Sequence, residues 1–213
     1  MKALIGICLL GLMTGCSEPD RPLKQPSEVT EAHASARHVE VFDTLSDQEE
    51  AADVIEFFSY RCPHCQVFAP LLADWAAQKG MSVEYMPIVW NTDTELYARF
   101  FYLTRHHADA QALHQQLFEQ VMQLDSEAPV EQQKTVLIQW AQEQGMKPDD
   151  ISEGLSSPAL QVAIERSSAL ARHYQIASTP TLVVKGTDKI LNRELTGYQH
   201  LLDIAEQRLR NAP

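Results

Sequence analysis

Two cysteines, Cys62 and Cys65, directly follow a short apolar run and open a second, longer apolar pattern. The run Val54-Ile55-Glu56-Phe57-Phe58 suits a central strand that is buried on both faces. Apolar residues then recur at helical spacing from Val67 to Trp75. The chain must therefore fold so that a strand leads into a helix whose first turn carries both thiols. Residues three apart on a helix are neighbours, so the two sulfurs can bridge.

The tetrapeptide Cys62-Pro63-His64-Cys65 suits the start of a helix. Cys62 would lie where unpaired backbone N–H groups and the positive end of the helix dipole favour an anion. Pro63 suits the first helical position, because the N–H group that it lacks would have no partner there. A partly positive His64 lowers the pKa of the Cys62 thiol further, and a stabilised thiolate makes the disulfide form a stronger oxidant. The motif therefore predicts thiol–disulfide exchange, with Cys65 resolving a mixed disulfide formed by Cys62.

An alternative interpretation of the cysteine pair is half of a zinc site, which needs four ligands. The sequence has no second C-x-x-C pair and no histidine pair with finger-like spacing. His106 and His107 are adjacent on an expected helix, so their side chains diverge. We therefore expect neither a metal site nor a bound cofactor.

The first residues predict an export signal. A basic start precedes an apolar stretch that is too short to span a bilayer, and small residues follow it. Residues 1–15 are therefore expected to be a signal peptide. Leu12-Met13-Thr14-Gly15-Cys16 resembles the bacterial lipobox, which implies lipidation of Cys16, although Met13 departs from the usual residue. The alternative is an ordinary signal that leaves Cys16 as a free thiol.

Residues 16–37 are rich in Pro, Glu, Ser and Ala and have almost no large apolar side chains, which predicts a lipid-anchored flexible tether. The formal net charge is −12 and no basic patch is present, so we expect no nucleic-acid partner. The chain has 45% hydrophobic residues, which is enough to bury one core with a helical insertion.

The rest of the chain predicts an α/β fold with a block of helices inside it. Strands are expected at five places: 38–44, 53–59, 82–89, 181–185 and 190–195. A helix follows the cysteines and stops at Gly80, and a last amphipathic helix runs through Leu209. Residues 91–174 have helical spacing throughout, ending in a longer helix from about Pro158 to Tyr174. The expected order is β-β-α-β, several helices, then β-β-α.

The segment Glu56-Phe57-Phe58-Ser59-Tyr60-Arg61-Cys62-Pro63-His64-Cys65 resembles the active-site segment of the DsbA family of periplasmic disulfide oxidases. That family has a thioredoxin fold with a helical domain inserted before the last two strands. The resemblance covers the chain from about Val39 to its end. It implies a thioredoxin-like domain built from residues 38–90 and 175–213, with the helical insertion at 91–174.

The resemblance also implies a role for Glu56, because the family uses a glutamate here, beneath the buried cysteine, to pass protons during exchange. Burial in an apolar strand should raise the pKa of this carboxyl group. The alternative is an outward-facing residue on a strand that is less buried.

Thr179-Pro180 precedes the strand expected at 181–185. In thioredoxin-like proteins a proline at this point is cis and faces the disulfide, which implies that the Thr179 backbone pairs with an extended substrate segment. The alternative is a plain loop proline before an edge strand. Threonine before this proline resembles the isomerase and reductase branches, whereas disulfide-oxidising members often carry valine.

The aromatic residues give a weaker prediction. Trp75, Trp90 and Trp140 are expected in the core or at a domain interface. Phe68 and Tyr198 are candidates to line an apolar groove near Cys62.

Together these features predict a monomeric, periplasmic, lipid-anchored enzyme that introduces disulfide bonds into reduced, unfolded exported proteins. The resemblance implies reoxidation by a quinone-linked membrane partner similar to DsbB. One alternative is a reductase or isomerase that uses the same residues, although His64 favours the oxidising direction. The short tether cannot form the extra domain of dimeric isomerases. Another alternative is a redox-inactive binding module, against which both cysteines argue.

Overall fold

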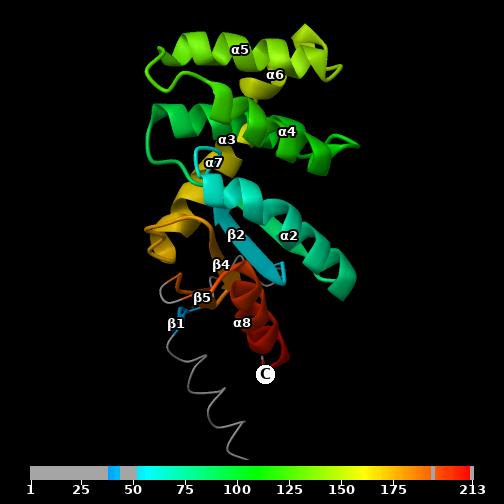
Figure 1. The fold of residues 1–213 in the computed structure, drawn as a ribbon. Helices are drawn as coiled ribbons and strands as arrows, with labels where there is room; N and C mark the ends of the chain where they lie inside the picture. Colours follow the sequence, from blue (N-terminus) through cyan, green and yellow to red (C-terminus); the bar gives the residue numbers. More distant parts are fainter. Residues whose placement is uncertain (1–37, 44–51, 193–194, 212–213) are drawn as a thin grey trace, which may run out of the picture.

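The computed structural model describes residues 38–43, 52–192 and 195–211 (Figure 1). Cys16, the expected signal peptide and the expected tether lie outside the described residues. None of the described helices combines the length and apolar character needed to cross a bilayer.

Within the described residues, five strands form one mixed sheet in the order β1-β5-β4-β2-β3. The strands are β1 (Val39–Val41), β2 (Val54–Phe58), β3 (Val83–Pro87), β4 (Thr181–Val184) and β5 (Asp188–Ile190). β2 runs parallel to β3 and antiparallel to β4. Every residue of β2 and β4 is buried, as expected for central strands that are covered on both faces.

β5 begins earlier than the sequence indicates. Lys185 and Gly186 both have positive φ angles, 53° and 69°, and the Thr187 N–H donates to the Val184 carbonyl. The three-residue loop over 185–187 reverses the chain at once, so Val184 pairs with Asp188. The strand expected at 190–195 is therefore replaced by a shorter one that ends at Ile190.

The helix that carries the cysteines, α2 (Pro63–Lys79), covers one face of the sheet together with α8 (Tyr198–Arg210). Val54 of β2 packs there against Phe68 of α2 and Leu202 of α8. The opposite face of the sheet is covered by the end of the last inserted helix, where Leu170 joins the buried cluster of that face. Successive residues of β2 thus point to two separate cores, which is the reason that the whole strand is apolar apart from Glu56.

Five helices lie between β3 and β4, and they confirm the expected helical insertion. They are α3 (Thr92–Thr104), α4 (Ala110–Gln123), α5 (Val130–Glu143), α6 (Pro148–Leu155) and α7 (Pro158–His173). Figure 1 shows the insertion stacked at the end of the sheet where α2 begins. Its apolar core continues into the thioredoxin part, because Phe58 and Cys65 belong to the same buried cluster as Phe100 and Leu137.

The histidine pair does not lie on a helix as expected. α3 ends at Thr104, whose hydroxyl donates to the Phe100 carbonyl, and the His107 N–H donates to the Thr104 carbonyl. His106 and His107 therefore lie in an exposed turn before α4.

Candidate active site

Cys62 lies at the N-cap of α2, as the motif predicts. Its sulfur accepts the Cys65 N–H at 3.3 Å, and its thiol donates to the Thr179 carbonyl at 3.3 Å. Hydrogen bonds from the Cys65 thiol and from the backbone N–H groups of Cys65 and His64 lower the pKa of Cys62 to about 5, against the opposing effect of partial burial. Cys62 is therefore a thiolate at neutral pH.

Cys65 has the opposite chemistry, although it stands only one helical turn away. Both cysteines are free thiols in the structure, but Cys65 is completely buried. Burial, reinforced by the hydrogen bond to Cys62, raises the pKa of Cys65 far above its usual range. The two sulfurs therefore differ in charge: Cys62 is a half-buried anion, and Cys65 is a buried neutral thiol.

The imidazole of His64 makes its hydrogen bond with Tyr198. Its Nδ1 lies 3.0 Å from the Tyr198 hydroxyl, while the backbone N–H of His64 contributes to the low pKa of Cys62. Tyr198 lines a cavity of about 410 Å³ beside the motif, as expected. Phe68 does not line it, because it is fully buried and stacks behind Tyr198 with 5.4 Å between ring centroids.

The Thr179–Pro180 peptide bond is cis, which confirms the expectation from the sequence. Both residues line the same cavity as His64 and Tyr198. The side-chain amide of Asn192, just beyond β5, donates to the Pro180 carbonyl and to the Thr181 hydroxyl. The structure therefore brings the loop from the far end of the chain against the Cys62 sulfur.

Glu56 is completely buried in β2, and neither carboxyl oxygen has a hydrogen-bond partner among the described residues. Burial, followed by the negative charge of Cys62, raises the pKa of Glu56 to about 8. The expectation of a buried carboxyl group with a raised pKa is confirmed, and the outward-facing alternative is wrong. The group can hold or release a proton close to neutral pH.

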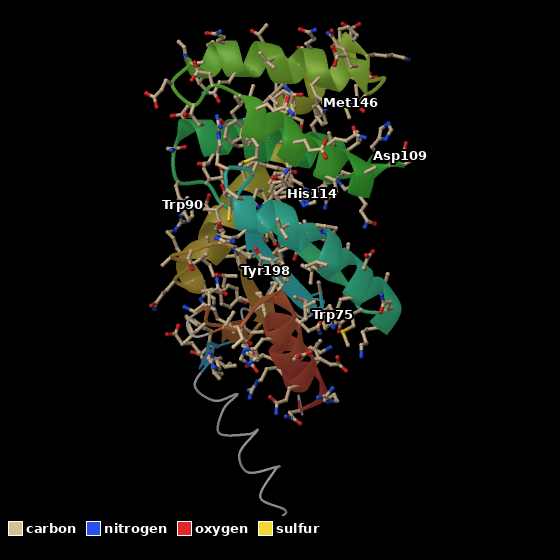
Figure 2. All side chains as sticks on the ribbon, in the orientation of Figure 1. Trp75, Trp90, Asp109, His114, Met146 and Tyr198 are labelled. Atoms are coloured by element: carbon tan, nitrogen blue, oxygen red, sulfur yellow. The ribbon has the colours of Figure 1, made fainter. Side chains whose placement is uncertain are left out.

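A second cavity, also of about 410 Å³, opens on the insertion side of Cys62. Trp90 (Figure 2) lines it with 57% of its surface exposed, so it is not a core residue, but it lies between the active-site turn and the start of α3, where an interface position was the other expectation. Trp75 and Trp140 are buried. The exposure of Trp90 has a local cause. Trp90 comes just before Asn91, the N-cap of α3, and its backbone N–H is held by the Thr94 hydroxyl, which leaves the indole outside.

Arg61 lines this second cavity and was not singled out by the sequence reasoning. Its guanidinium donates to the Tyr97 hydroxyl of α3 and to the Leu124 carbonyl at the end of α4. Its position in the sequence was a possible indication, because the charged side chain of an arginine next to a reactive cysteine needs either polar partners or contact with solvent. Its partners lie 36 and 63 residues away, so no local pattern identifies them.

The described part of the chain has no group of three His, Cys, Asp or Glu side chains placed to hold a metal ion. The arrangement can therefore be described from the thiols, the carboxyl group and the surrounding hydrogen bonds alone.

Comparisons with known proteins agree with this geometry. Residues 47–204 match the family model described as Thioredoxin. The thiol:disulfide interchange protein DsbA of Bordetella parapertussis is 28% identical over 160 residues, which cover 74% of this chain and 75% of the relative. The crystal structure of Pseudomonas aeruginosa DsbA superposes with a TM-score of 0.68 at 19% identity, covering 81% of this chain and 91% of that one. A Proteus mirabilis DsbA, solved with a non-covalently bound peptide PWATCDS, has a TM-score of 0.64 at 16% identity and covers 82% and 96%.

Proposed function

We propose that this chain, which belongs to the thioredoxin family and is a DsbA-like protein-disulfide oxidoreductase, introduces disulfide bonds into exported proteins in the periplasm. The observation that carries the proposal is the division of the two thiols. The pKa of Cys62 is lowered to about 5, while burial raises the pKa of Cys65 far above its usual range. A stabilised thiolate favours the reduced protein, so the oxidised protein readily gives its disulfide away.

The exchange would take two steps at Cys62. A substrate thiolate attacks the Cys62 sulfur of the Cys62–Cys65 disulfide, which forms a mixed disulfide and releases Cys65. Cys65 takes a proton from the Glu56 carboxyl group, since its buried sulfur strongly favours the neutral thiol. A second substrate thiolate then attacks the substrate sulfur and releases Cys62 as a stable thiolate. Two substrate thiols have lost two electrons, and the cysteine pair has accepted them.

The backbone at Thr179 supports binding of an extended substrate segment. Its carbonyl lies 3.3 Å from the Cys62 sulfur, and the cavity that it shares with Pro180 and Tyr198 provides an apolar wall. An extended peptide could pair with this backbone as an added strand. The peptide-bound relative from Proteus mirabilis supports a peptide ligand for this fold.

The remaining expectations belong to the same proposal. Residues 1–15 would direct export, a lipid on Cys16 and the tether over 16–37 would hold the enzyme at a membrane, and a quinone-linked partner similar to DsbB would restore the disulfide. The monomeric enzyme would comprise a thioredoxin part, residues 38–90 and 175–213, and the insertion 91–174.

Thr179 favours the opposite direction, a reductase or isomerase that uses the same residues. The equilibrium of the cysteine pair with glutathione separates the two functions. We expect a reduction potential close to the about −120 mV that is typical of DsbA proteins. A value near the about −270 mV of thioredoxin would overturn the oxidising direction and leave disulfide exchange intact.

A trapping experiment tests the exchange itself. Cys65→Ser should accumulate a mixed disulfide between Cys62 and a reduced cysteine peptide, because the resolving thiol is missing. The matched variant Cys62→Ser should trap nothing, since Cys65 is buried. Failure of Cys65→Ser to trap the peptide, shown by mass spectrometry, would favour the redox-inactive binding module.

A further inference from the structure

His114 is a buried imidazole in α4 that the proposed exchange does not use. It is 6% exposed and stands among aromatic rings, with the ring of Phe58 at 4.9 Å between centroids. Its Nδ1 lies 2.7 Å from the hydroxyl of Tyr60. Its Nε2 is buried and has no hydrogen-bond partner among the described residues. A buried polar atom without a hydrogen bond lowers the stability of the fold, so it usually has a water partner or a functional role.

A second orphaned group, Glu56, lies on the same side of the sheet. Glu56 in β2 is the register partner of Tyr85 in β3, and the Tyr85 ring lies 5.1 Å from the His114 ring. Burial, followed by the negative charge of Glu56, raises the pKa of both Tyr60 and Tyr85. The carboxyl group, the two phenols and the imidazole therefore form one buried polar cluster behind the cysteines.

This cluster borders a cavity of about 270 Å³ between α2 and α4. Tyr85 and His114 line its inner end, and Ala69, a small residue of α2, leaves the space open. Arg105 and Gln111, both exposed, line its outer end, so the cavity reaches the surface. Figure 2 shows His114 at this position between the two helices. The cavity is large enough for several water molecules, each occupying about 30 Å³.

The surroundings keep the imidazole neutral. The titratable or charged groups around it are Tyr60, Tyr85 and Glu56 from the sheet side and Arg105 from α3. Burial lowers the pKa of His114 to about 3. A neutral imidazole carries a proton on one nitrogen and accepts one on the other, as a proton carrier requires.

We propose that His114 and Tyr60 carry protons between Glu56 and the water of this cavity. The inference rests on the proposed function, in which Glu56 gives a proton to Cys65. The emptied carboxylate takes the Tyr60 hydroxyl proton through a bridging water molecule, because neither Glu56 oxygen has a hydrogen-bond partner among the described residues. Tyr60 takes the proton from His114 Nδ1, and Nε2 takes one from cavity water. One proton enters for each Cys65 thiol formed, and no electrons move along the route.

The route resets itself over one catalytic cycle. After the inward transfer, the His114 proton sits on Nε2 and the Tyr60 hydroxyl points at Nδ1. When Cys65 is oxidised again, Glu56 first releases its proton outward by the same bonds in reverse, and the emptied carboxylate then takes the proton of the Cys65 thiol. The imidazole thus alternates between its two tautomers and never becomes charged for longer than a transfer step.

The test compares five full-length variants in single-turnover exchange with a reduced cysteine peptide, in H₂O and D₂O. His114→Leu and Tyr60→Phe should each slow the proton-linked step about 10-fold or more, as loss of a proton-transfer group does. Glu56→Gln should slow it at least as much, and the double variant Glu56→Gln/His114→Leu should be no slower than Glu56→Gln. Phe101→Leu, which opens space in the same cavity without removing a proton carrier, should leave the rate unchanged. The glutathione equilibrium and the Cys62 pKa should be unaltered in His114→Leu.

Chemical rescue separates proton transfer from a structural effect. Free imidazole should restore the rate of His114→Ala, because the cavity admits it to the vacated place, and it should not change Phe101→Leu. A normal rate in His114→Leu beside a slow Glu56→Gln would overturn the relay and leave the proposed function standing. A normal rate in Glu56→Gln would instead overturn its role in the proposed function. Additive effects in the double variant would also overturn the relay.

Discussion

Glu56 and Cys65 show how strongly burial can shift the pKa of a side chain. Both lie in the apolar interior at 0% exposure, and for both burial is the largest cause of a raised pKa. Hydrogen bonds shift the pKa of Cys62 in the other direction, although this half-buried residue is only three positions from Cys65. The difference in pKa between the two thiols therefore depends on how strongly each sulfur is shielded from solvent as well as on residue type.

The buried carboxyl group of Glu56 should make the protein less stable as the pH rises. Its pKa is raised from 4.5 in the ordinary carboxyl to about 8 in the folded protein. The penalty is absent below pH 4.5, grows between 4.5 and 8, and is complete above 8. Glu56→Gln should therefore raise the free energy of unfolding by a few kcal/mol at pH 8 and by almost nothing at pH 4.

Urea unfolding of the disulfide form measures this difference, since Cys62 carries no charge in that form. The exposed Glu119 provides a control, because Glu119→Gln should change stability by less than about 0.5 kcal/mol at either pH. An equal effect of Glu56→Gln at both pH values would contradict the raised pKa.

Only some properties of the individual site residues could be predicted from the sequence. Burial of Glu56 follows from its place in an apolar strand, and the N-cap position of Cys62 follows from the motif. The direction of the His64 ring does not follow, because it depends on a hydroxyl 134 residues away. His114 is hidden for the same reason: nothing near it in the chain shows that α2 will cover it.

The helix α2 is defined by its two ends. Cys62 caps the start, and Gly80 ends the helix with φ 65°, while the Met81 N–H donates to the Ala76 carbonyl. This combination of a left-handed glycine and a bond five residues back is a common helix stop. It was predicted from Gly80 alone. The positive φ angle of Lys185 was not predicted, since a lysine in this conformation is uncommon.

Gly80→Ala should destabilise the protein by about 1 kcal/mol through the backbone alone. A Cβ atom at this position meets no atom within 4 Å, so no packing clash contributes. Gly80→Asn should cost less, because asparagine tolerates the left-handed conformation better. Thermal or urea unfolding of the two variants checks the order. Equal losses would show that something other than backbone conformation sets the cost.

A bridge of polar side chains links the active-site turn to two helices of the insertion. Arg61, next to Cys62, donates to the Tyr97 hydroxyl, which donates in turn to the side-chain carbonyl of Gln133 in α5. Gln133 is buried and donates to the Ala128 carbonyl. The bridge thus links the active-site turn to α3 and α5. The order of strands and helices was predictable from periodicity, but this bridge was not, because it joins three distant segments.

Removing the Tyr97 hydroxyl should loosen the insertion. Tyr97→Phe leaves the buried Gln133 carbonyl without its donor, which should cost about 1–3 kcal/mol. Tyr102→Phe is a matched control on the same helix, since the Tyr102 hydroxyl lies 3.8 Å from the Met86 sulfur and beside Ser167 and takes no part in the bridge. Hydrogen exchange should quicken in α5 for Tyr97→Phe and remain unchanged for Tyr102→Phe. Equal exchange in the two variants would show that the bridge does not hold α5.

The pairing of β2 with β4 has a consequence for the moment at which the enzyme becomes active. Phe57 and Thr181 are neighbours in the sheet but are separated by the whole insertion along the chain. A ribosome makes the insertion before it makes Thr179 and Pro180. Until those residues emerge, Cys62 lacks the loop that faces it, and Glu56 lacks the strand that covers one side of it. The surroundings of both groups are therefore assembled only when the last part of the chain has been made and has paired with β2.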